Sequence, residues 1–259
     1  MNNSSEFEEV DLLVRKARIA QEKFEQKGSQ QLFDLACQAV GWALMEPEHN
    51  QRLAELAVKE TGLGNVSDKI KKNHNKTLGL LRDIKGVKSF GHVSEDEELG
   101  LSVYLRPKGV VAAIVPSTNP LATPVNNIIN ALKCGNSIIV APSPKGAQPF
   151  RELLSIIHNN LSLIGVDQDL VQMVPMPPTK GKTNRLMQLA DMLVVTGSQN
   201  NVKAGYSSGT PALGVGQGNV VTIIDETADI GDAAAKISVS KTFDNATSCS
   251  SENSVIAIE

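Results

Sequence analysis

The stretch GVVAAIVPSTNPLATPVNNIINALKCGNSIIVA, residues 109–141, decides the fold class. It begins with a short apolar run at 109–115 and ends with a second one at 136–141. Residues 121–133 between them are a helical candidate, and Gly135 follows where a glycine commonly ends a helix. Strands that are apolar throughout and are joined by a helix are typical of a parallel sheet with both faces covered.

On the carboxyl side of this stretch, short apolar runs keep alternating with helical candidates. This alternation predicts an open parallel sheet of the α/β class. On the amino side, the pattern from Glu6 to about Asp83 is helical, and LGLSVYLRP at 99–107 is predicted to be an edge strand that leads into the sheet. The further apolar runs are 170–174, 191–195, 211–215 and 220–224, and the further helical candidates are 147–160, 181–190, 198–207 and 227–241.

Composition limits the classes of partner. The chain has 259 residues, 41% hydrophobic and 20% charged, which suits one large globular domain or two small ones. A net charge of −3 favours neither nucleic acid nor an anionic membrane, and no segment reaches transmembrane length, so we predict neither as a partner. The acidic start MNNSSEFEEVDLL lacks the apolar run of a secretory signal, and we predict a cytoplasmic protein.

The three cysteines differ in their surroundings. Cys37, Cys134 and Cys249 are widely spaced and odd in number, which fits a reducing compartment better than a disulfide framework. Cys37 lies in an apolar helical stripe and is predicted to be buried. Cys249, in TFDNATSCSSENS at 242–254, lies among small polar residues and is either an accessible, reactive thiol or a structural cysteine that tolerates solvent. The four histidines lack metal-ligand spacing, so we assign no metal site.

Two loops follow predicted strands, where open α/β sheets bind ligands. PSTNP at 116–120 is irregular and polar, and VTGS at 195–198 precedes a helical candidate whose N-terminus can hold a pyrophosphate. A simple capping turn would also explain either loop. GKT at 181–183 lacks the earlier glycine of a P-loop, because Met176 stands there. GVGQGN at 214–219 lacks dinucleotide-binding spacing and is either a tight strand-to-strand turn or a backbone that approaches a ligand closely.

Six motifs occur in order along the chain: VPSTNP, APSP, VTGS, SSGTPALGVGQGN, IDETADI and SKTFDNATSCSSENSV. Together they resemble the CoA-acylating branch of the aldehyde dehydrogenase superfamily, from about Val10 to the last residue. The segment TGLGNVSDKIKKNHNKTLGLLRDI at 61–84 tilts the resemblance toward the sulfoacetaldehyde dehydrogenases. The resemblance implies an aldehyde dehydrogenase-like α/β fold with a helical amino-terminal region (1–100) packed on an NAD(P)-binding domain (101–240), followed by the start of a catalytic domain (241–259).

The resemblance also implies roles for single residues. Cys249 occupies the place of the nucleophile, and Asn119 matches the asparagine whose amide forms an oxyanion hole with the Cys249 backbone N–H. The other matches concern the dinucleotide: Ser143 and Pro144 fall at the adenosine ribose, Thr196, Gly197 and Ser198 at the pyrophosphate turn and Gly216 beside the nicotinamide, and Ser117 and Thr118 of the PSTNP loop are assigned to cofactor binding as well.

The implied reaction oxidises an aldehyde, acetaldehyde or sulfoacetaldehyde, with NAD or NADP and coenzyme A to an acyl-CoA through a cysteine thioester. Hydrolytic members carry a glutamate general base about where Val215 stands, but no Asp or Glu occurs between Asp191 and Asp225. Water needs such a base, whereas a thiol with a pKa of about 8.5 ionises readily, so we predict acyl transfer to CoA. The family's ribose motif often has a lysine and an acidic residue where Ala141 and Pro144 stand, so NADP is not excluded.

Two alternative functions are a hydrolytic aldehyde dehydrogenase of the same fold and a non-catalytic nucleotide-binding or assembly module. The second is favoured because the family continues for most of a catalytic domain beyond the nucleophile, whereas ten residues follow Cys249 here. The sequence is therefore interpreted as an amino-terminal fragment. The expected partners are a small-molecule aldehyde and CoA. A full-length chain is expected to form a homo-oligomer, in the cytoplasm or in a bacterial microcompartment.

Overall fold

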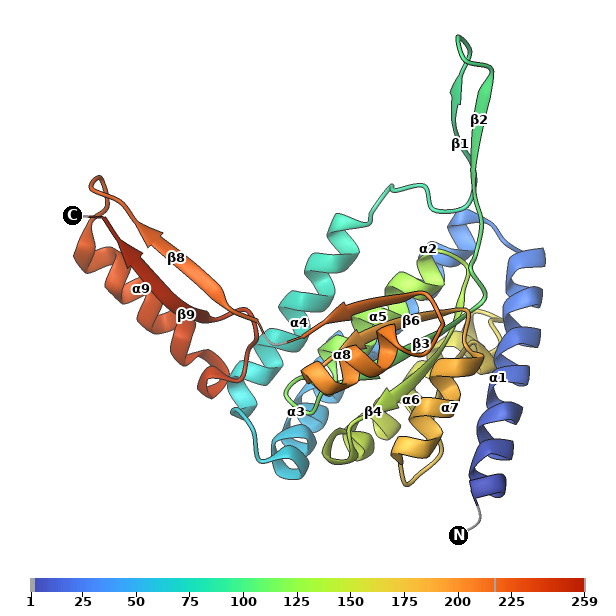
Figure 1. Cartoon of the computed structure of the whole chain (residues 1–259), viewed down its shortest axis with the longest axis horizontal. Coiled ribbons are helices and arrows are strands. Elements are labelled where there is room, and N and C mark those ends of the chain that lie inside the picture. Colours follow the sequence, from blue (N-terminus) through green and yellow to red (C-terminus); the bar gives the residue numbers. More distant parts are fainter. Residues whose placement is uncertain (1–2, 217, 259) are drawn as a thin grey trace.

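The computed structural model describes residues 3–216 and 218–258, and its centre is a five-stranded sheet in the order β5-β4-β3-β6-β7 (Figure 1). Every neighbouring pair in this sheet is parallel, because a helical connection returns the chain between successive strands. The predicted α/β fold with an open parallel sheet is confirmed. The strands are β3 (Val110–Val115), β4 (Ser137–Pro142), β5 (Val171–Met173), β6 (Met192–Thr196) and β7 (Ala212–Val215).

Helices cover both faces of this sheet. The odd-numbered residues of β3 from Val111 to Val115 belong to a core shared with α2, α5 and α6, and the even-numbered residues from Val110 to Ile114 belong to a second core with α1 and α7. Successive side chains in a strand point to opposite faces, so a strand covered on both sides must be apolar throughout. These helices are α1 (Asn3–Gln26), α2 (Gln30–Met45), α5 (Ala122–Lys133), α6 (Ala147–Leu163) and α7 (Lys180–Leu189).

The amino-terminal region is helical, as predicted, and it supplies part of both cores. Helix α2 packs against α5 and α6, while α1 packs along α7 on the other face. Cys37 on α2 is buried, which confirms its predicted place in the core. No described helix is both long and apolar enough to cross a membrane. The remaining helical elements around the sheet are α3 (Pro47–Thr61), α4 (Val66–Asp83), α8 (Gln199–Tyr206), η1 (Pro144–Gly146) and η2 (Gln168–Leu170).

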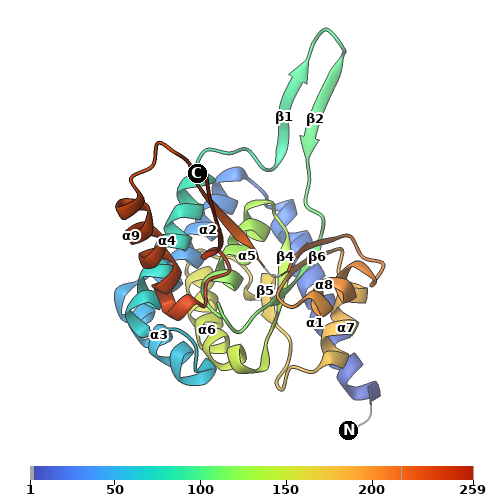
Figure 2. The same cartoon turned by 60° about the vertical axis from the view of Figure 1, so that its left-hand side comes forward.

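Strands β1 (Gly91–Asp96) and β2 (Leu101–Leu105) form an antiparallel hairpin that projects from the body of the molecule (Figures 1 and 2). The prediction that 99–107 is an edge strand leading into the main sheet is therefore wrong. The segment is a strand, but its partner is β1. All five residues of β2 are exposed, so no core decides where the strand pairs.

A second small unit follows the main sheet. Strand β8 (Val220–Ile224) pairs in parallel with β9 (Glu252–Ala257), and α9 (Ile230–Thr242) and the short turn η3 (Phe243–Ala246) connect them. In Figures 1 and 2 this β8–α9–β9 unit stands beside α4, apart from the five-stranded sheet. The apolar run at 220–224 is thus a parallel strand, but it lies in a different sheet from the runs before it. The predicted domain boundary near residue 240 stays a prediction.

Candidate active site

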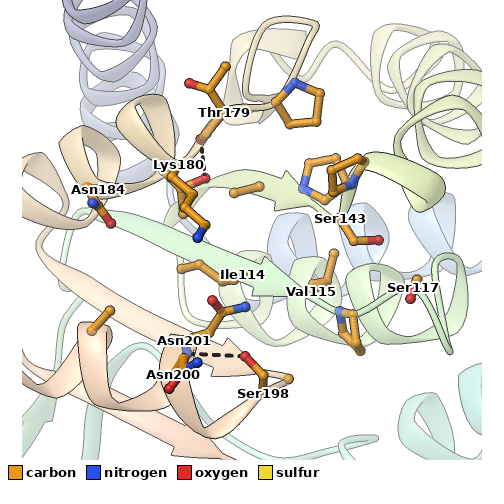
Figure 3. A pocket seen from close by; sticks show the side chains of 18 of the residues that line it. Ile114, Val115, Ser117, Ser143, Thr179, Lys180, Asn184, Ser198, Asn200 and Asn201 are labelled. Atoms are coloured by element: carbon orange, nitrogen blue, oxygen red, sulfur yellow. Dashed lines mark hydrogen bonds between the residues drawn. The ribbon is translucent and has the colours of Figure 1, made fainter.

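The strand order reverses between β3 and β6. From β3 the chain moves outward through β4 and β5, and it then returns to the other side of β3 as β6. Open α/β sheets bind ligands at the carboxyl ends of their strands beside such a reversal. A cavity of about 560 Å³ opens there, hereafter the sheet-end cavity (Figure 3). Five of the predicted cofactor-binding residues line it: Ser117, Ser143, Pro144, Gly197 and Ser198.

Three hydroxyl side chains around the sheet-end cavity cap helical turns. Ser143 Oγ accepts a hydrogen bond from the backbone N–H of Gly146 at 3.3 Å, and Ser198 Oγ accepts one from Asn201 at 3.3 Å. Thr179 Oγ1 caps α7 by accepting from the backbone N–H of Lys182 at 3.1 Å. The capping interpretation of the VTGS turn therefore holds. It is compatible with anion binding, because the same caps direct the positive ends of α7 and α8 toward the cavity.

Lys180 is a cavity residue that the sequence motifs missed. It is exposed, and Figure 3 shows its amine pointing into the sheet-end cavity from the first turn of α7. Among the described residues that line this cavity, it carries the only charge. A cation in the first turn opposes the helix dipole, so its position right after the Thr179 cap is a signal that sequence inspection can use. The cavity therefore favours a ligand with negative charge.

A second cavity, of about 690 Å³, lies between the sheet edge and the β8–α9–β9 unit, and we call it the thiol cavity. It brings Asn119 and Cys249 into one lining, although 130 positions separate them in the sequence. Pro116, Gly197 and Ser198 line both cavities, so the two lie side by side. The thiol cavity also collects the predicted residues Thr118, Thr196 and Gly216.

The thiol cavity has no charged residue in its described lining. Val215 stands in this lining at the place where the hydrolytic relatives were expected to hold a glutamate. A water molecule in the cavity therefore meets hydroxyl and amide groups, but no carboxylate that could take its proton. A nucleophile that ionises more easily than water, such as a thiol, is better suited to this cavity.

The three thiols differ in accessibility. Cys249 is exposed, Cys134 is half-buried and Cys37 is buried. Burial raises the pKa of the Cys37 thiol to about 12, and the nearby Asp34 carboxylate adds to that effect. Burial also raises the pKa of Cys134. Cys249 is therefore the thiol that a reagent or a substrate reaches first.

The loop that carries Cys249 is packed against the glycine-rich segment before β8. A Cβ atom at Gly218 would lie 2.5 Å from the Cys249 carbonyl oxygen, so only glycine permits this approach. Asn253 Nδ2 donates to the Gly218 carbonyl at 3.1 Å, and Ser251 Oγ donates to the Ser248 carbonyl at 2.9 Å. The sequence left GVGQGN either as a tight turn between strands or as a backbone that approaches a ligand closely. The structure shows a close backbone approach at Gly218, and its partner is the Cys249 loop of the same chain.

The profile of the aldehyde dehydrogenase family matches residues 3–259. The chain is 56% identical to the acylating sulfoacetaldehyde dehydrogenase of Cupriavidus necator over 252 residues. The aligned part covers 97% of this chain and 51% of that protein. The acetylating aldehyde dehydrogenase of Geobacillus thermoglucosidasius superposes with a TM-score of 0.92 at 37% identity, over 99% of this chain and 56% of that one.

A further solved structure concerns the chemistry of the cysteine. The propionaldehyde dehydrogenase of Rhodopseudomonas palustris, with bound CoA and an acylated cysteine, superposes with a TM-score of 0.83 at 32% identity, over 96% of this chain and 56% of that one. In each comparison, nearly the whole of this chain is matched. The chain therefore spans about half the length of the relatives that it matches.

Proposed function

This chain belongs to the aldehyde dehydrogenase family, and we propose that it carries the nucleophile and the cofactor-binding loops of a CoA-acylating aldehyde dehydrogenase. The single observation that supports this proposal most is the thiol cavity. Cys249 and Asn119 share its lining, the described lining has no carboxylate, and the cavity adjoins the sheet-end cavity. An exposed thiol beside an amide donor can carry the acyl group, and the adjoining anion-favouring cavity can hold the dinucleotide.

Each residue has a defined task in this proposal. The Cys249 thiolate attacks the aldehyde carbonyl carbon, and the Asn119 amide donates a hydrogen bond to the oxygen on which negative charge develops, an effect worth about 3 kcal/mol in comparable sites. A bound nicotinamide supplies the redox chemistry by accepting hydride. Cys249 is left as a thioester, and the CoA thiolate displaces the acyl group from it. The carboxylate-free lining around Val215 disfavours attack by water on the same thioester.

The sheet-end cavity fits a phosphate-rich dinucleotide. The capped N-termini of α7 and α8 border it, and its described lining carries one positive and no negative charge. A carboxylate beside the ribose would repel the 2′-phosphate of NADP, and Pro144 stands where the family often has one. We propose that the cavity accepts NADP as well as NAD, with Lys180 as the cation beside the phosphorylated ribose.

The aldehyde is proposed to be acetaldehyde or sulfoacetaldehyde, and the Cupriavidus necator relative, an acylating sulfoacetaldehyde dehydrogenase, favours the second. The described lining of the thiol cavity holds no cation that would select a sulfonate. Assembly as a homo-oligomer and a location in the cytoplasm or a bacterial microcompartment complete the proposal.

The half-reaction between Cys249 and an acyl-CoA tests this function without a nicotinamide. Acetyl-CoA and the 259-residue chain are expected to exchange the acyl group, which releases free CoA and adds one acetyl group to the peptide that carries Cys249. Mass spectrometry measures the addition, and Cys249→Ala is expected to abolish it. Unlabelled Cys249 after prolonged incubation with acetyl-CoA and, separately, with sulfoacetyl-CoA would contradict the proposal and favour a non-catalytic module.

A second experiment separates acyl transfer from hydrolysis. NADPH and NADH formation is followed with each aldehyde, in the presence and absence of CoA. We expect sustained turnover to require CoA, because the thiol cavity offers water no general base in its described lining. Equal turnover without CoA would favour the hydrolytic alternative.

A further inference from the structure

A buried ionic cluster lies five residues before the nucleophile. The Asp244 side chain is completely buried, and the side chains of Lys69 and Lys72 on α4 are 2% exposed. Lys69 Nζ donates to Asp244 Oδ2 at 3.2 Å, and Lys72 Nζ donates to the same oxygen. The Thr247 hydroxyl also donates to Asp244 Oδ2, at 2.7 Å. The Asp244 carboxylate thus connects two lysines of α4 with Thr247, which lies two positions before Cys249. Because all three charged side chains are buried, the loss of one partner would leave a buried charge uncompensated.

Backbone groups extend the cluster in both directions. The backbone N–H of Asn65 donates to Asp244 Oδ1 at 3.1 Å, and the backbone N–H of Asp244 donates to Asp68 Oδ2 at 2.9 Å. Asn245 Nδ2 reaches the Gly64 carbonyl at 3.1 Å. Gly64 itself has a φ of 72°, and a Cβ atom there would overlap the Asp244 carboxylate. The first turn of α4 and the turn before Cys249 are therefore built as complementary partners.

The turn that Asp244 begins adopts an unfavourable backbone conformation. Asp244, Asn245 and Ala246 have φ values of 52°, 54° and 58°, all in the left-handed region. This region costs about 1–2 kcal/mol for most residues that have a side chain, and less for Asp and Asn, so the cost is greatest at Ala246. Three such residues in succession persist only when their surroundings hold them. The contacts from Lys69, Lys72, Asn65 and Asp68 are the interactions that hold this turn.

The charges of the cluster support an ionised carboxylate. Burial by itself raises the pKa of Asp244, but the hydrogen bonds from Lys72 and Thr247 and the two ammonium charges outweigh it and hold that pKa below its usual range. Burial and the neighbouring Lys72 lower the pKa of Lys69, while Asp244 opposes that change. Removal of the Asp244 charge would leave two buried ammonium groups beside each other, so the turn depends on this carboxylate.

We propose that Asp244, held by Lys69 and Lys72, is a positioning residue that fixes the turn 244–247 and thereby the place of Cys249 and its backbone N–H opposite Asn119. Asp244 acts through the loop, because Ala246, Thr247, Ser248 and Cys249 line the thiol cavity and Asp244 does not. Between the described elements, the packing of η3 against α4 is the principal contact that joins the β8–α9–β9 unit to the rest of the chain. The catalytic consequence rests on the proposed function, whereas the effect on the loop does not.

The test compares Asp244→Asn and Lys72→Met with Lys76→Met in the 259-residue chain. Lys76 lies one turn further along α4 and is exposed, so it controls for the loss of a lysine from this helix. Lys72→Met keeps the Lys69–Asp244 pair, and it therefore decides the outcome if Asp244→Asn does not fold. The measurements are hydrogen–deuterium exchange of peptides, NADPH binding by fluorescence, and kcat and KM for the aldehyde.

Asp244→Asn and Lys72→Met are expected to speed amide exchange in residues 243–251 about tenfold or more, with unchanged exchange in 109–141 and NADPH affinity within twofold of the original chain. Turnover is expected to show a fall in kcat with little change in KM, because Cys249 is misplaced but the aldehyde still enters the cavity. Lys76→Met is expected to leave both the amide exchange in 243–251 and kcat unchanged. The exchange measurement stands whether or not the chain turns over aldehyde, so it is independent of the proposed activity.

Two outcomes would overturn the positioning role. The first is a Lys72→Met variant whose amide exchange rates in 243–251 lie within twofold of those of the original chain. Where turnover is measured, its kcat would also lie within twofold. The other is a loss of exchange protection in 109–141 and of NADPH binding that is as large as the loss of protection in 243–251, which would mark Asp244 as a general stabiliser of the fold.

Discussion

Cys249 combines exposure with a backbone that is held on two sides, by Gly218 and by the turn that begins at Asp244. Asn119 lies in the same cavity, on the loop after β3. These contacts fix the position of the Cys249 thiol in the cavity; they do not by themselves assign its chemical role. The assignment of Cys249 as nucleophile, of Asn119 as oxyanion donor and of the remaining site residues to the cofactor stays a prediction.

Alkylation of the three thiols is expected to be strongly selective for Cys249. At pH 8, iodoacetamide should modify Cys249 first, Cys134 more slowly and Cys37 last, because the pKa of Cys37 is raised to about 12 and burial raises that of Cys134. Peptide mass spectrometry after timed quenching gives the three rates. The rate at Cys37 should rise further as the pH approaches 12, provided the fold persists. A Cys37 rate equal to that of Cys249 in the folded chain would contradict the burial.

Lys180→Met is expected to weaken NADP binding at least tenfold and NAD binding by less than threefold. A salt bridge to a phosphate in a partly desolvated cavity is worth about 1.5–3 kcal/mol, and NAD lacks that phosphate. Fluorescence titration with NADPH and NADH measures both affinities. Lys145→Met is the control, since Lys145 is also exposed near the strand ends but does not line the sheet-end cavity. Equal losses for both dinucleotides would place Lys180 elsewhere than at the phosphorylated ribose.

At the scale of elements, two connections meet at the thiol cavity. The segment between β7 and β8 contributes Gly216 and Gly218, and the segment between η3 and β9 contributes Cys249. Neither connection is long enough to have a core of its own. The two connections contact each other, and the second follows η3, which packs on α4, so a change in either connection is expected to move Cys249.

Gly218→Ala is expected to slow Cys249 alkylation and acyl exchange at least fivefold. The added methyl group would meet the Cys249 carbonyl oxygen at 2.5 Å, and both segments must shift to relieve that contact. Gly79→Ala is the matched control, because a Cβ atom at that position on α4 meets nothing within 4 Å. That control is expected to be neutral or to stabilise the chain by up to about 1 kcal/mol. Alkylation rates that are the same in both variants would refute the close approach.

At the scale of the whole molecule, the β8–α9–β9 unit differs from the main sheet in how it is covered. None of the residues of α9 is buried, and Val221, Ile223, Val255 and Ile256 of its two strands are exposed. The five-stranded sheet has a core on each face. The unit that carries Cys249 therefore depends on local contacts, which include the buried Asp244 cluster.

Acid is expected to destabilise the fold, with the loss concentrated at and below about pH 4, the usual range of aspartate titration. Hydrogen bonds from Arg185 and Asn65 lower the pKa of Asp11 and Asp68 respectively, and the lysines lower that of Asp244 against the effect of burial. A lowered pKa in the folded state adds stability above the ordinary pKa, and this stability is lost as the pH falls through the folded value. Melting temperatures from pH 7 to pH 3 test this, and Asp244→Asn should show a smaller decrease over that range. A melting temperature that rises on acidification would contradict the assignment.

The sequence by itself determined the α/β class, the alternation of strands and helices along the chain and the contrast between Cys37 and Cys249. These features follow from local patterns: an unbroken apolar run such as 110–115 can be stable only where both faces are covered, and a cysteine among small polar residues has no apolar stripe to join. The family resemblance rested on motifs in order along the chain, which a sequence also displays directly.

Only the tertiary structure decided which strands pair and which distant residues meet. Strand β2 pairs with β1, and β8 with β9, because partner choice depends on surfaces that a short apolar run does not specify. Lys180 enters the sheet-end cavity through the placement of α7 (Figure 3), and Lys69 meets Asp244 across 175 positions of sequence. Contacts of that range depend on how whole elements dock, so no local pattern in the chain encodes them.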